Sequence, residues 1–203
     1  MMIFRKKVNS GFTLVELLVT ITIFTVLTGV VLFSQSKFNS SILLTNLAYD
    51  IALTTRQAQN YGINIKEYDA GEFLPYGVHF DLSSTKSFIL FADHGYYNNK
   101  EKVSPYDGGV TFCDLGHGCV NRYNIQGGNF ISALCVTSGE GETCDLEKLD
   151  IIFQRPDPDA KIYAGGVTDT TYSKAVIVVT GSDGSNREVV FQANGLIQIG
   201  ENI

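Results

Sequence analysis

The sequence is poor in the residues from which catalytic and metal sites are usually built. It has three histidines, His79, His94 and His117, among 203 residues, and none of them stands in a nucleophile or zinc-hydrolase motif. His79 lies between Val78 and Phe80 in an apolar segment, which is the pattern of an ordinary strand position. We therefore predict that the chain is not an enzyme, and keep a membrane-tethered enzyme as the less favoured alternative.

Positive charge is also scarce. The chain has 15 Lys and Arg against 21 Asp and Glu, a formal net charge of -6, and no Lys or Arg from Glu188 to the end. Cations of the second half are scattered along the sequence, among them Arg122, Arg155, Lys161, Lys174 and Arg187. An acidic protein without a basic patch repels nucleic acid, so a nucleic-acid partner is not expected.

One long apolar run is present. Residues 12–33 contain a single charged residue, Glu16. As a helix they would extend roughly 33 Å at about 1.5 Å per residue, enough to cross a bilayer core of about 30 Å. Secretory signal peptides have a shorter apolar core, and Ser34-Gln35-Ser36 is a poor cleavage site of that kind. The run predicts a membrane-spanning segment.

The charges that flank this run predict its orientation. Arg5, Lys6 and Lys7 precede the run, and only Lys37 follows it closely. The bias keeps the amino terminus cytoplasmic and places the chain after about residue 36 outside.

Four cysteines lie in the part expected outside: Cys113, Cys119, Cys135 and Cys144. An even number in an oxidising compartment indicates disulfides, and three pairings are possible. We favour the local pairs 113 with 119 and 135 with 144, each closing a small loop. A metal site of the cysteines with His117 is the alternative, but the spacing differs from the Cys-x-x-Cys of structural zinc.

Three aspartates could instead offer oxygen ligands to calcium. Asp157 and Asp159 alternate with prolines, and Asp183 lies in a Gly-Ser-Asp-Gly-Ser-Asn segment. Turn chemistry explains both segments equally well, and the second lacks a twelve-residue calcium loop with its closing Glu. We predict no metal and no cofactor.

The start of the apolar run resembles a known family. Residues 10–18 read Ser-Gly-Phe-Thr-Leu-Val-Glu-Leu-Leu after a short basic leader. This is similar to type IV pilins and the pseudopilins of type II secretion. The resemblance implies that a prepilin peptidase cleaves after Gly11, that Phe12 becomes the N-methylated first residue, and that residues 1–11 are a leader. Unlike many type IVa pilins, the span has no proline.

Glu16 is the residue of the span that most needs an explanation. A charged group near the centre of a membrane helix costs about 2.5–3.5 kcal/mol on insertion scales, so it calls for a partner. The amine that cleavage would create at Phe12 is the obvious one, and methylation keeps its positive charge. A carboxylate one turn into the helix reaches a neighbour's amine better than its own, so we expect the pair to set subunit register. The plainer interpretation is an acid stabilised by the helix N-terminus.

The span also carries small and hydroxylated residues: Thr13, Thr20, Thr22, Thr25, Thr28 and Gly29. They suit helix packing within membranes. Each threonine could equally bond back to the preceding turn of its own helix.

Beyond the membrane the helical pattern continues to about Tyr61, and Gly62 is a plausible stop. The apolar face consists of Leu44, Leu47, Ala48, Ile51, Thr55 and Ala58, and the polar face of Asn46, Asp50, Thr54, Arg56 and Gln57. We divide the chain into the leader 1–11, a transmembrane and assembly helix 12–36, an amphipathic half-helix 37–62 and an extracytoplasmic head 63–203.

The head has the periodicity of strands. Residues 73–80 and 86–92 predict a hairpin joined at 81–84, and residues 109–112, 130–136, 149–154, 175–180, 188–192 and 196–199 predict further strands. Asp183-Gly184 and Asn194-Gly195 supply turns. The predicted fold class is α+β: a long N-terminal helix whose outer half packs on an antiparallel β-sheet head, as in pilins.

Within that family, residues 47–65, 76–80 and 190–195 are similar to minor pilins and pseudopilins of the GspH/FimT type. The resemblance implies a structural minor subunit of a type IV pilus or a type II secretion pseudopilus, located in the bacterial inner membrane before assembly. Its partners would be other pilins or pseudopilins, a prepilin peptidase and an inner-membrane assembly platform. A DNA-binding minor pilin of an uptake pilus is the alternative.

Overall fold

A computed structural model describes residues 11–64, 66–67, 73–93, 106, 118–139, 141–144, 146–165 and 172–201. One α-helix, α1 (Leu14–Ile63), precedes a β-rich part of the chain. The chain divides into two compact units, one ending at Asn39 and the other comprising Ser40–Ile203, and each is described by itself. The predicted strand at 109–112 lies outside the described residues.

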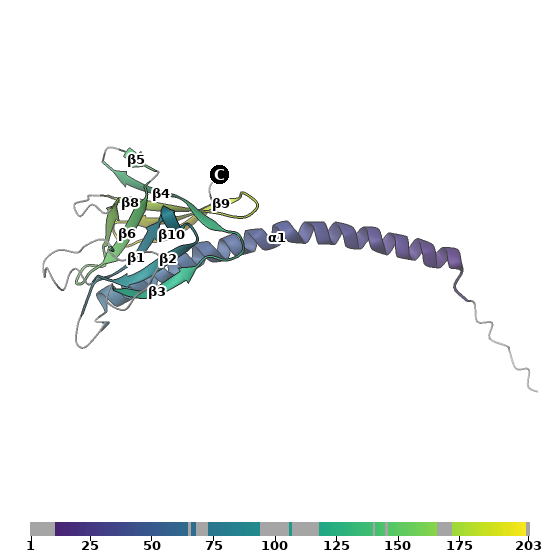
Figure 1. The fold of residues 1–203 in the computed structure, drawn as a ribbon, viewed down its shortest axis with the longest axis horizontal. Helices are drawn as coiled ribbons and strands as arrows, with labels where there is room; N and C mark the ends of the chain where they lie inside the picture. The colour runs from purple at the N-terminus through teal and green to yellow at the C-terminus, as the bar shows by residue number, and fades with distance from the viewer. Residues whose placement is uncertain are drawn as a thin grey trace, which may run out of the picture. The chain divides into compact units, whose positions relative to one another are not determined.

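The second unit contains two antiparallel sheets of five strands (Figure 1). The first has the order β3-β2-β1-β6-β7 and the second β10-β9-β8-β4-β5. The strands of the first sheet are β1 (Tyr76–Asp81), β2 (Ser87–Ala92), β3 (Cys119–Asn124), β6 (Lys148–Phe153) and β7 (Ala160–Ala164). Those of the second are β4 (Phe130–Ser138), β5 (Gly141–Thr143), β8 (Lys174–Thr180), β9 (Asn186–Gln192) and β10 (Ile197–Glu201). The α+β, pilin-like arrangement predicted from the sequence is confirmed, with two sheets in place of the single sheet expected.

The predicted hairpin is formed by β1 and β2, which pair from Tyr76 with Ala92 to Phe80 with Phe88. A short 3₁₀ helix, Leu82–Ser84, connects them, and the Asp81 carboxylate caps it by accepting a hydrogen bond from Ser83 N at 2.7 Å. The two glycine turns are also as predicted, since Gly184 and Gly195 have φ of 82° and 80°, a region that favours glycine.

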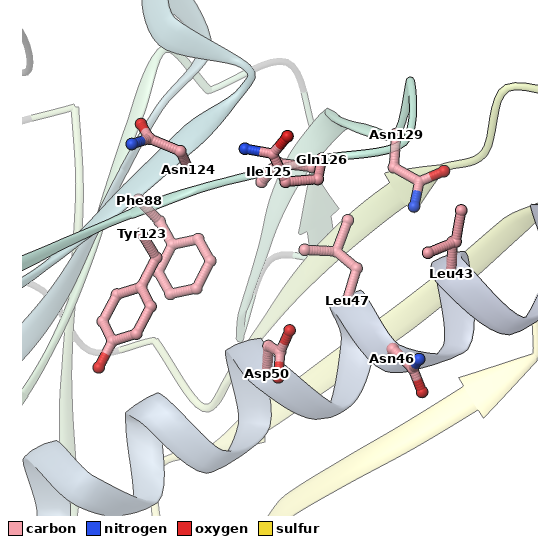
Figure 2. A pocket seen from close by; sticks show the side chains of 10 residues that line it. All are labelled: Leu43, Asn46, Leu47, Asp50, Phe88, Tyr123, Asn124, Ile125, Gln126 and Asn129. Carbon is pink, nitrogen blue, oxygen red and sulfur yellow. The ribbon is translucent and has the colours of Figure 1, made fainter.

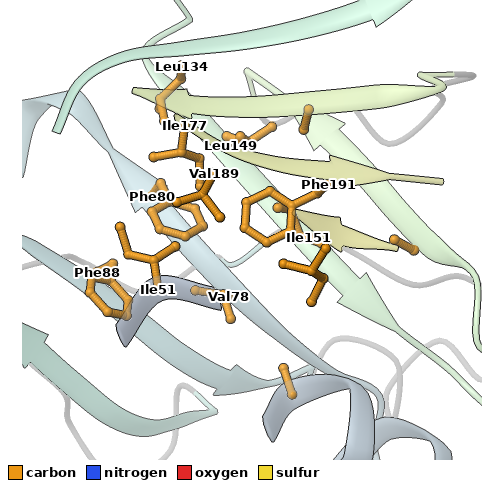
Figure 3. Close-up of a cluster of buried hydrophobic side chains, with 14 of the residues drawn as sticks. Ile51, Val78, Phe80, Phe88, Leu134, Leu149, Ile151, Ile177, Val189 and Phe191 are labelled. Carbon is orange, nitrogen blue, oxygen red and sulfur yellow. The ribbon is translucent and has the colours of Figure 1, made fainter. Parts of the chain in front are cut away.

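One core joins the helix to both sheets (Figure 3). Ile51 of α1 packs in it with side chains of the first sheet, including Val78 and Phe80, and of the second sheet, including Ile177 and Phe191. All six residues of the predicted apolar helix face are buried: Leu44, Leu47, Ala48, Ile51, Thr55 and Ala58. The prediction that the outer half of the helix packs against the β-sheet head is confirmed.

The prediction for Thr54 is wrong. We expected this residue on the polar face, and it is buried. Thr54 follows Ile51 by three positions and precedes Ala58 by four, so it borders the buried stripe. Because two sheets flank the helix where one was expected, that stripe is wider than the sequence pattern indicates.

Gly62 has a different role from the stop signal predicted. It lies within α1, which ends at Ile63, and a Cβ there would collide with the backbone carbonyl of Phe153 on β6. The backbone oxygen of Gly62 accepts a hydrogen bond from Arg155 N at 3.2 Å. The absence of a side chain therefore lets the helix end lie directly against the first sheet.

Candidate functional site

The predicted cleavage position lies just before the helix. Gly11 and Phe12 are exposed and precede the first helical residue, Leu14. The hydroxyl oxygen of Thr13 accepts a hydrogen bond from Glu16 N at 3.3 Å, as an N-cap residue does. Among the described residues, a Cβ added at Gly11 would meet no atom within 4 Å. The peptide bond between Gly11 and Phe12 is thus non-helical and sterically open.

Glu16 lies in the first turn of α1 and is the only acidic residue there. Its carboxylate is exposed and makes no hydrogen bond or ion pair to any residue that the structure describes. A negative group near a helix N-terminus is favoured by about 0.3–1 kcal/mol, so this position suits a carboxylate. No described residue of the chain therefore competes for this carboxylate.

The segment that follows has the length and composition of a membrane span. Residues Leu14–Leu32 have a mean hydropathy of 2.3, and none of them is buried within the protein. Large apolar side chains point outward along the whole segment, among them Leu14, Leu17, Leu18, Ile21, Phe24, Leu27, Val31 and Leu32. A helix of this kind needs lipid or other helices around it.

The threonines of the span mostly bond to their own helix. Thr20, Thr22 and Thr25 each donate a hydrogen bond at 2.8 Å to a backbone carbonyl three or four residues earlier, and Thr13 is the N-cap. These hydroxyls therefore do not need partners on another helix. Of the two interpretations of these residues, the structure favours back-bonding.

Comparisons with known proteins agree with this geometry. Residues 6–32 match the prokaryotic N-terminal methylation motif. No curated protein and no solved structure matches the chain. The matched motif is typical of type IV pilins and pseudopilins, and it implies processing by a prepilin peptidase and a structural role among pilins. The apolar helix and the motif together are consistent with anchoring in the inner membrane before assembly.

The structure also locates the cysteines that it describes. Cys135, on β4, is bonded to Cys144, which confirms one of the two predicted local disulfides. Cys119 is disulfide-bonded as well, while Cys113 and His117 lie outside the described residues. The bond from Cys135 to Cys144 fastens the short edge strand β5 to β4.

A buried hydrogen-bonded pair that sequence reasoning missed lies on the first sheet. His79 Nδ1 lies 2.7 Å from Asp150 Oδ1, and each side chain is 2% exposed. The ring of Tyr106 lies over the histidine, with centroids 4.9 Å apart. Burial raises the pKa of Asp150 above its ordinary value, although His79 opposes that shift. Since Tyr106 covers the pair and a substrate could not reach it, we assign the pair to cross-strand packing.

The aspartates considered for calcium lie in turns and loops. Asp183 Oδ1 accepts hydrogen bonds from the backbone and hydroxyl of Ser185, and these bonds lower the pKa of Asp183. Asp157 and Asp159 are exposed in the loop before β7. In the described part of the chain, no three His, Cys, Asp or Glu side chains gather in a way that would hold a metal ion.

Proposed function

We propose that this chain is a minor pilin or pseudopilin, a structural subunit of a type IV pilus or a type II secretion pseudopilus. The observation that carries the proposal is the carboxylate of Glu16, which pairs with no described residue and lies one turn into an exposed apolar helix that bears the methylation motif. In this proposal residues 1–11 are the leader, 12–36 the transmembrane and assembly helix, 37–62 the amphipathic half-helix and 63–203 the extracytoplasmic head.

The proposed chemistry begins with cleavage after Gly11. Cleavage exposes an amine at Phe12, which methylation leaves positively charged. The amine of one subunit then pairs with Glu16 of a neighbour that is shifted along the filament. Because both groups lie in an apolar bundle, each stabilises the other against the cost of burial, and a wrong register leaves both unpaired. The pairing selects one axial position for the incoming subunit.

The head is proposed to present a surface to neighbouring subunits and to the assembly machinery. Three of the cations that the structure describes in the head are each engaged with a local group. Arg187 bonds to Thr45 at 3.1 Å, Lys174 pairs with Glu142 at 3.0 Å, and Lys161 bonds to Gln154 at 2.6 Å. This arrangement supports a structural subunit over the DNA-binding alternative, which would need its cations gathered in one patch.

Replacing Glu16 tests the proposal. In cells that assemble filaments, Glu16→Leu and the uncharged isostere Glu16→Gln should leave leader cleavage and membrane insertion intact but remove the protein from sheared filaments. Val15→Leu, one residue earlier, is the matched control and should be incorporated normally. Normal incorporation of both Glu16 variants would refute the assembly role.

A direct binding measurement addresses the alternative. The full chain in nonionic detergent should not retard a double-stranded DNA fragment at low salt. A shift that weakens as salt is added would support the DNA-binding minor pilin instead.

A further inference from the structure

In the described part of the chain, four strands lie at the edges of the two sheets: β3 and β7 in the first, β10 and β5 in the second. An edge strand offers main-chain groups to other chains, and proteins usually protect it by short length, charges, an irregular register or a covering segment.

Three of these edges have such protection. β5 is three residues long and is fastened by a disulfide to β4. β7 carries the exposed Lys161, and its Ala160 N donates a hydrogen bond to Ala193 O at 2.7 Å. β3 is mostly polar, its register with β2 shifts after Leu90, and it lines a cavity of about 260 Å³ against α1 (Figure 2).

β10 is a regular and open edge. Its five residues keep an unbroken register with β9 and include no Pro, Lys or Arg. Gln198 is exposed, and Ile199 and Gly200 are partly exposed. Among the described residues, a Cβ added at Gly200 would meet no atom within 4 Å. This stretch of β10 therefore leaves room for another chain beside it.

The hydrogen-bond ladder shows which main-chain groups of β10 face the open side. Next to the turn, Gln192 N donates to Leu196 O at 2.9 Å. Hydrogen-bonded pairs alternate along an antiparallel ladder, so every second residue of β10 bonds to β9, while Ile197 and Ile199 direct their N–H and C=O away from it. Neither isoleucine makes a main-chain hydrogen bond to any described residue. Another extended backbone offers donors and acceptors at the matching spacing, so the edge calls for a strand.

Glu188 indicates which side chain this strand should carry. On β9 it lies directly opposite Gly200, so no side chain of β10 separates its carboxylate from the edge. Glu188 is partly buried and makes no ion pair with any described residue. A residue added opposite Gly200 lies two strands away, about 10 Å, within reach of a Lys or Arg side chain extended over the glycine. A second copy of β10 is a poorer match, because the sequence from Glu188 to the end has two acids and no Lys or Arg.

We propose that β10 binds an extended strand of a partner protein, which adds to the second sheet in antiparallel orientation. The partner strand has an apolar residue opposite Ile199 and a Lys or Arg opposite Gly200. The main chain of the apolar residue exchanges two hydrogen bonds with Ile199, and the cation reaches the carboxylate of Glu188. The site goes beyond the proposed function, because it uses only groups of the head and does not depend on Glu16.

Short peptides test the edge on the full chain in nonionic detergent micelles. The Lys peptide is N-acetyl-Thr-Val-Lys-Val-Thr-Val-amide, and the Glu peptide has Glu in place of Lys. Amide resonances of Ile197 and Ile199 report on occupancy, because both protons should become protected from exchange with water. We expect saturable binding of the Lys peptide, and binding of the Glu peptide that is weaker by about two- to fivefold.

Backbone methylation of the peptide distinguishes strand pairing from a looser contact. In the proposed register the valines direct their N–H toward β10, and the lysine and threonines direct theirs away from it. N-methylation of the valine after lysine should weaken binding about tenfold, and N-methylation of the threonine that follows it should change binding by about twofold or less. The two methylated peptides have the same composition.

Two pairs of variants locate the binding. Ile199→Pro removes an N–H on the open side, where an edge strand tolerates proline, and should weaken binding about tenfold. Ile199→Val keeps the main-chain groups and should bind the Lys peptide normally. Glu188→Gln should abolish the preference for the Lys peptide over the Glu peptide. Glu142→Gln removes a carboxylate from β5, at the opposite edge of the same sheet, and should leave that preference unchanged.

Three results would overturn the proposal. They are the absence of saturable binding of the Lys peptide, equal losses from the two methylated peptides, and equal binding by Ile199→Pro and Ile199→Val. Protection of the Ile199 amide without any peptide, in a chain that is dimeric in detergent, would also overturn it and assign the edge to a second copy. Since no probe involves filament assembly, these outcomes are independent of the fate of Glu16 variants.

Discussion

Truncating Ile51, on the buried face of the helix, should destabilise the protein much more than truncating a residue on the exposed face. Ile51 is fully buried among side chains of both sheets. Ile51→Ala therefore leaves a cavity that could close only if strands of both sheets moved. Such truncations cost about 2–5 kcal/mol. Taking about 3 kcal/mol, and about 2–4 °C per kcal/mol for a protein of this size, the melting temperature should fall by about 6–12 °C.

Leu53→Ala is the matched control, two residues further along the same helix. Leu53 is 64% exposed, and its truncation should cost no more than about 0.5 kcal/mol, or about 1–2 °C. Near-ultraviolet circular dichroism of tyrosine is a suitable probe for the full chain in detergent, because all ten tyrosines lie at or after Tyr49 and there is no tryptophan. Equal losses from the two variants would refute the docking of the helix between the sheets.

Two further predictions concern the head. Replacing Cys135 and Cys144 together by Ala should lower the free energy of unfolding by about 2–3 kcal/mol, as expected for a disulfide that closes a loop with a sequence separation of 9. Urea titrations measure this change, and an unchanged urea midpoint of unfolding would contradict it. Burial opposes ionisation of Asp81, but hydrogen bonds from Ser83 and the charge of Lys148 outweigh it and lower the pKa of Asp81 below 3.8. The charge of Asp81 therefore stabilises the fold above about pH 4, and this stability is lost as the pH falls through the pKa of Asp81 in the folded protein. The difference in free energy of unfolding between the protein and Asp81→Asn should shrink on acidification from about pH 5 to pH 3. A difference that stays constant would contradict this.

The fold was largely predictable because its signals are local. The buried helix face repeats at three and four residues, and the hairpin of β1 and β2 consists of two short, mostly apolar runs joined by a turn with a capping aspartate. Three strands gave no adequate local signal. β5 is three residues long, β3 is mostly polar at the sheet edge, and β7 follows a proline-rich loop. β5 and β7 are defined by pairing with the preceding strands β4 and β6, and β3 by pairing with β2 across a longer connection. The division into two sheets depends on pairings between strands far apart in the sequence, such as β1 with β6 and β4 with β8.

The cleavage region and the buried pair of His79 and Asp150 also differ in how local their sequence signals are. Gly11, Phe12 and Glu16 fall within six consecutive residues and can be recognised from spacing alone. The buried pair unites His79 with Asp150 across a separation of 71 residues, which only the register of β1 with β6 brings together. A hydrophobic pattern identifies which face of a strand is buried, and it does not identify which polar residue is opposite.

The most direct test of the central claim is the intact mass of the protein extracted from membranes, with and without an active prepilin peptidase. With the enzyme active, we expect a chain that begins at Phe12, has lost residues 1–11 and carries the added mass of one methyl group. Without it, the full chain should retain Met1 or the residue that follows it. Recovery of the uncleaved chain from cells with active enzyme would contradict the account.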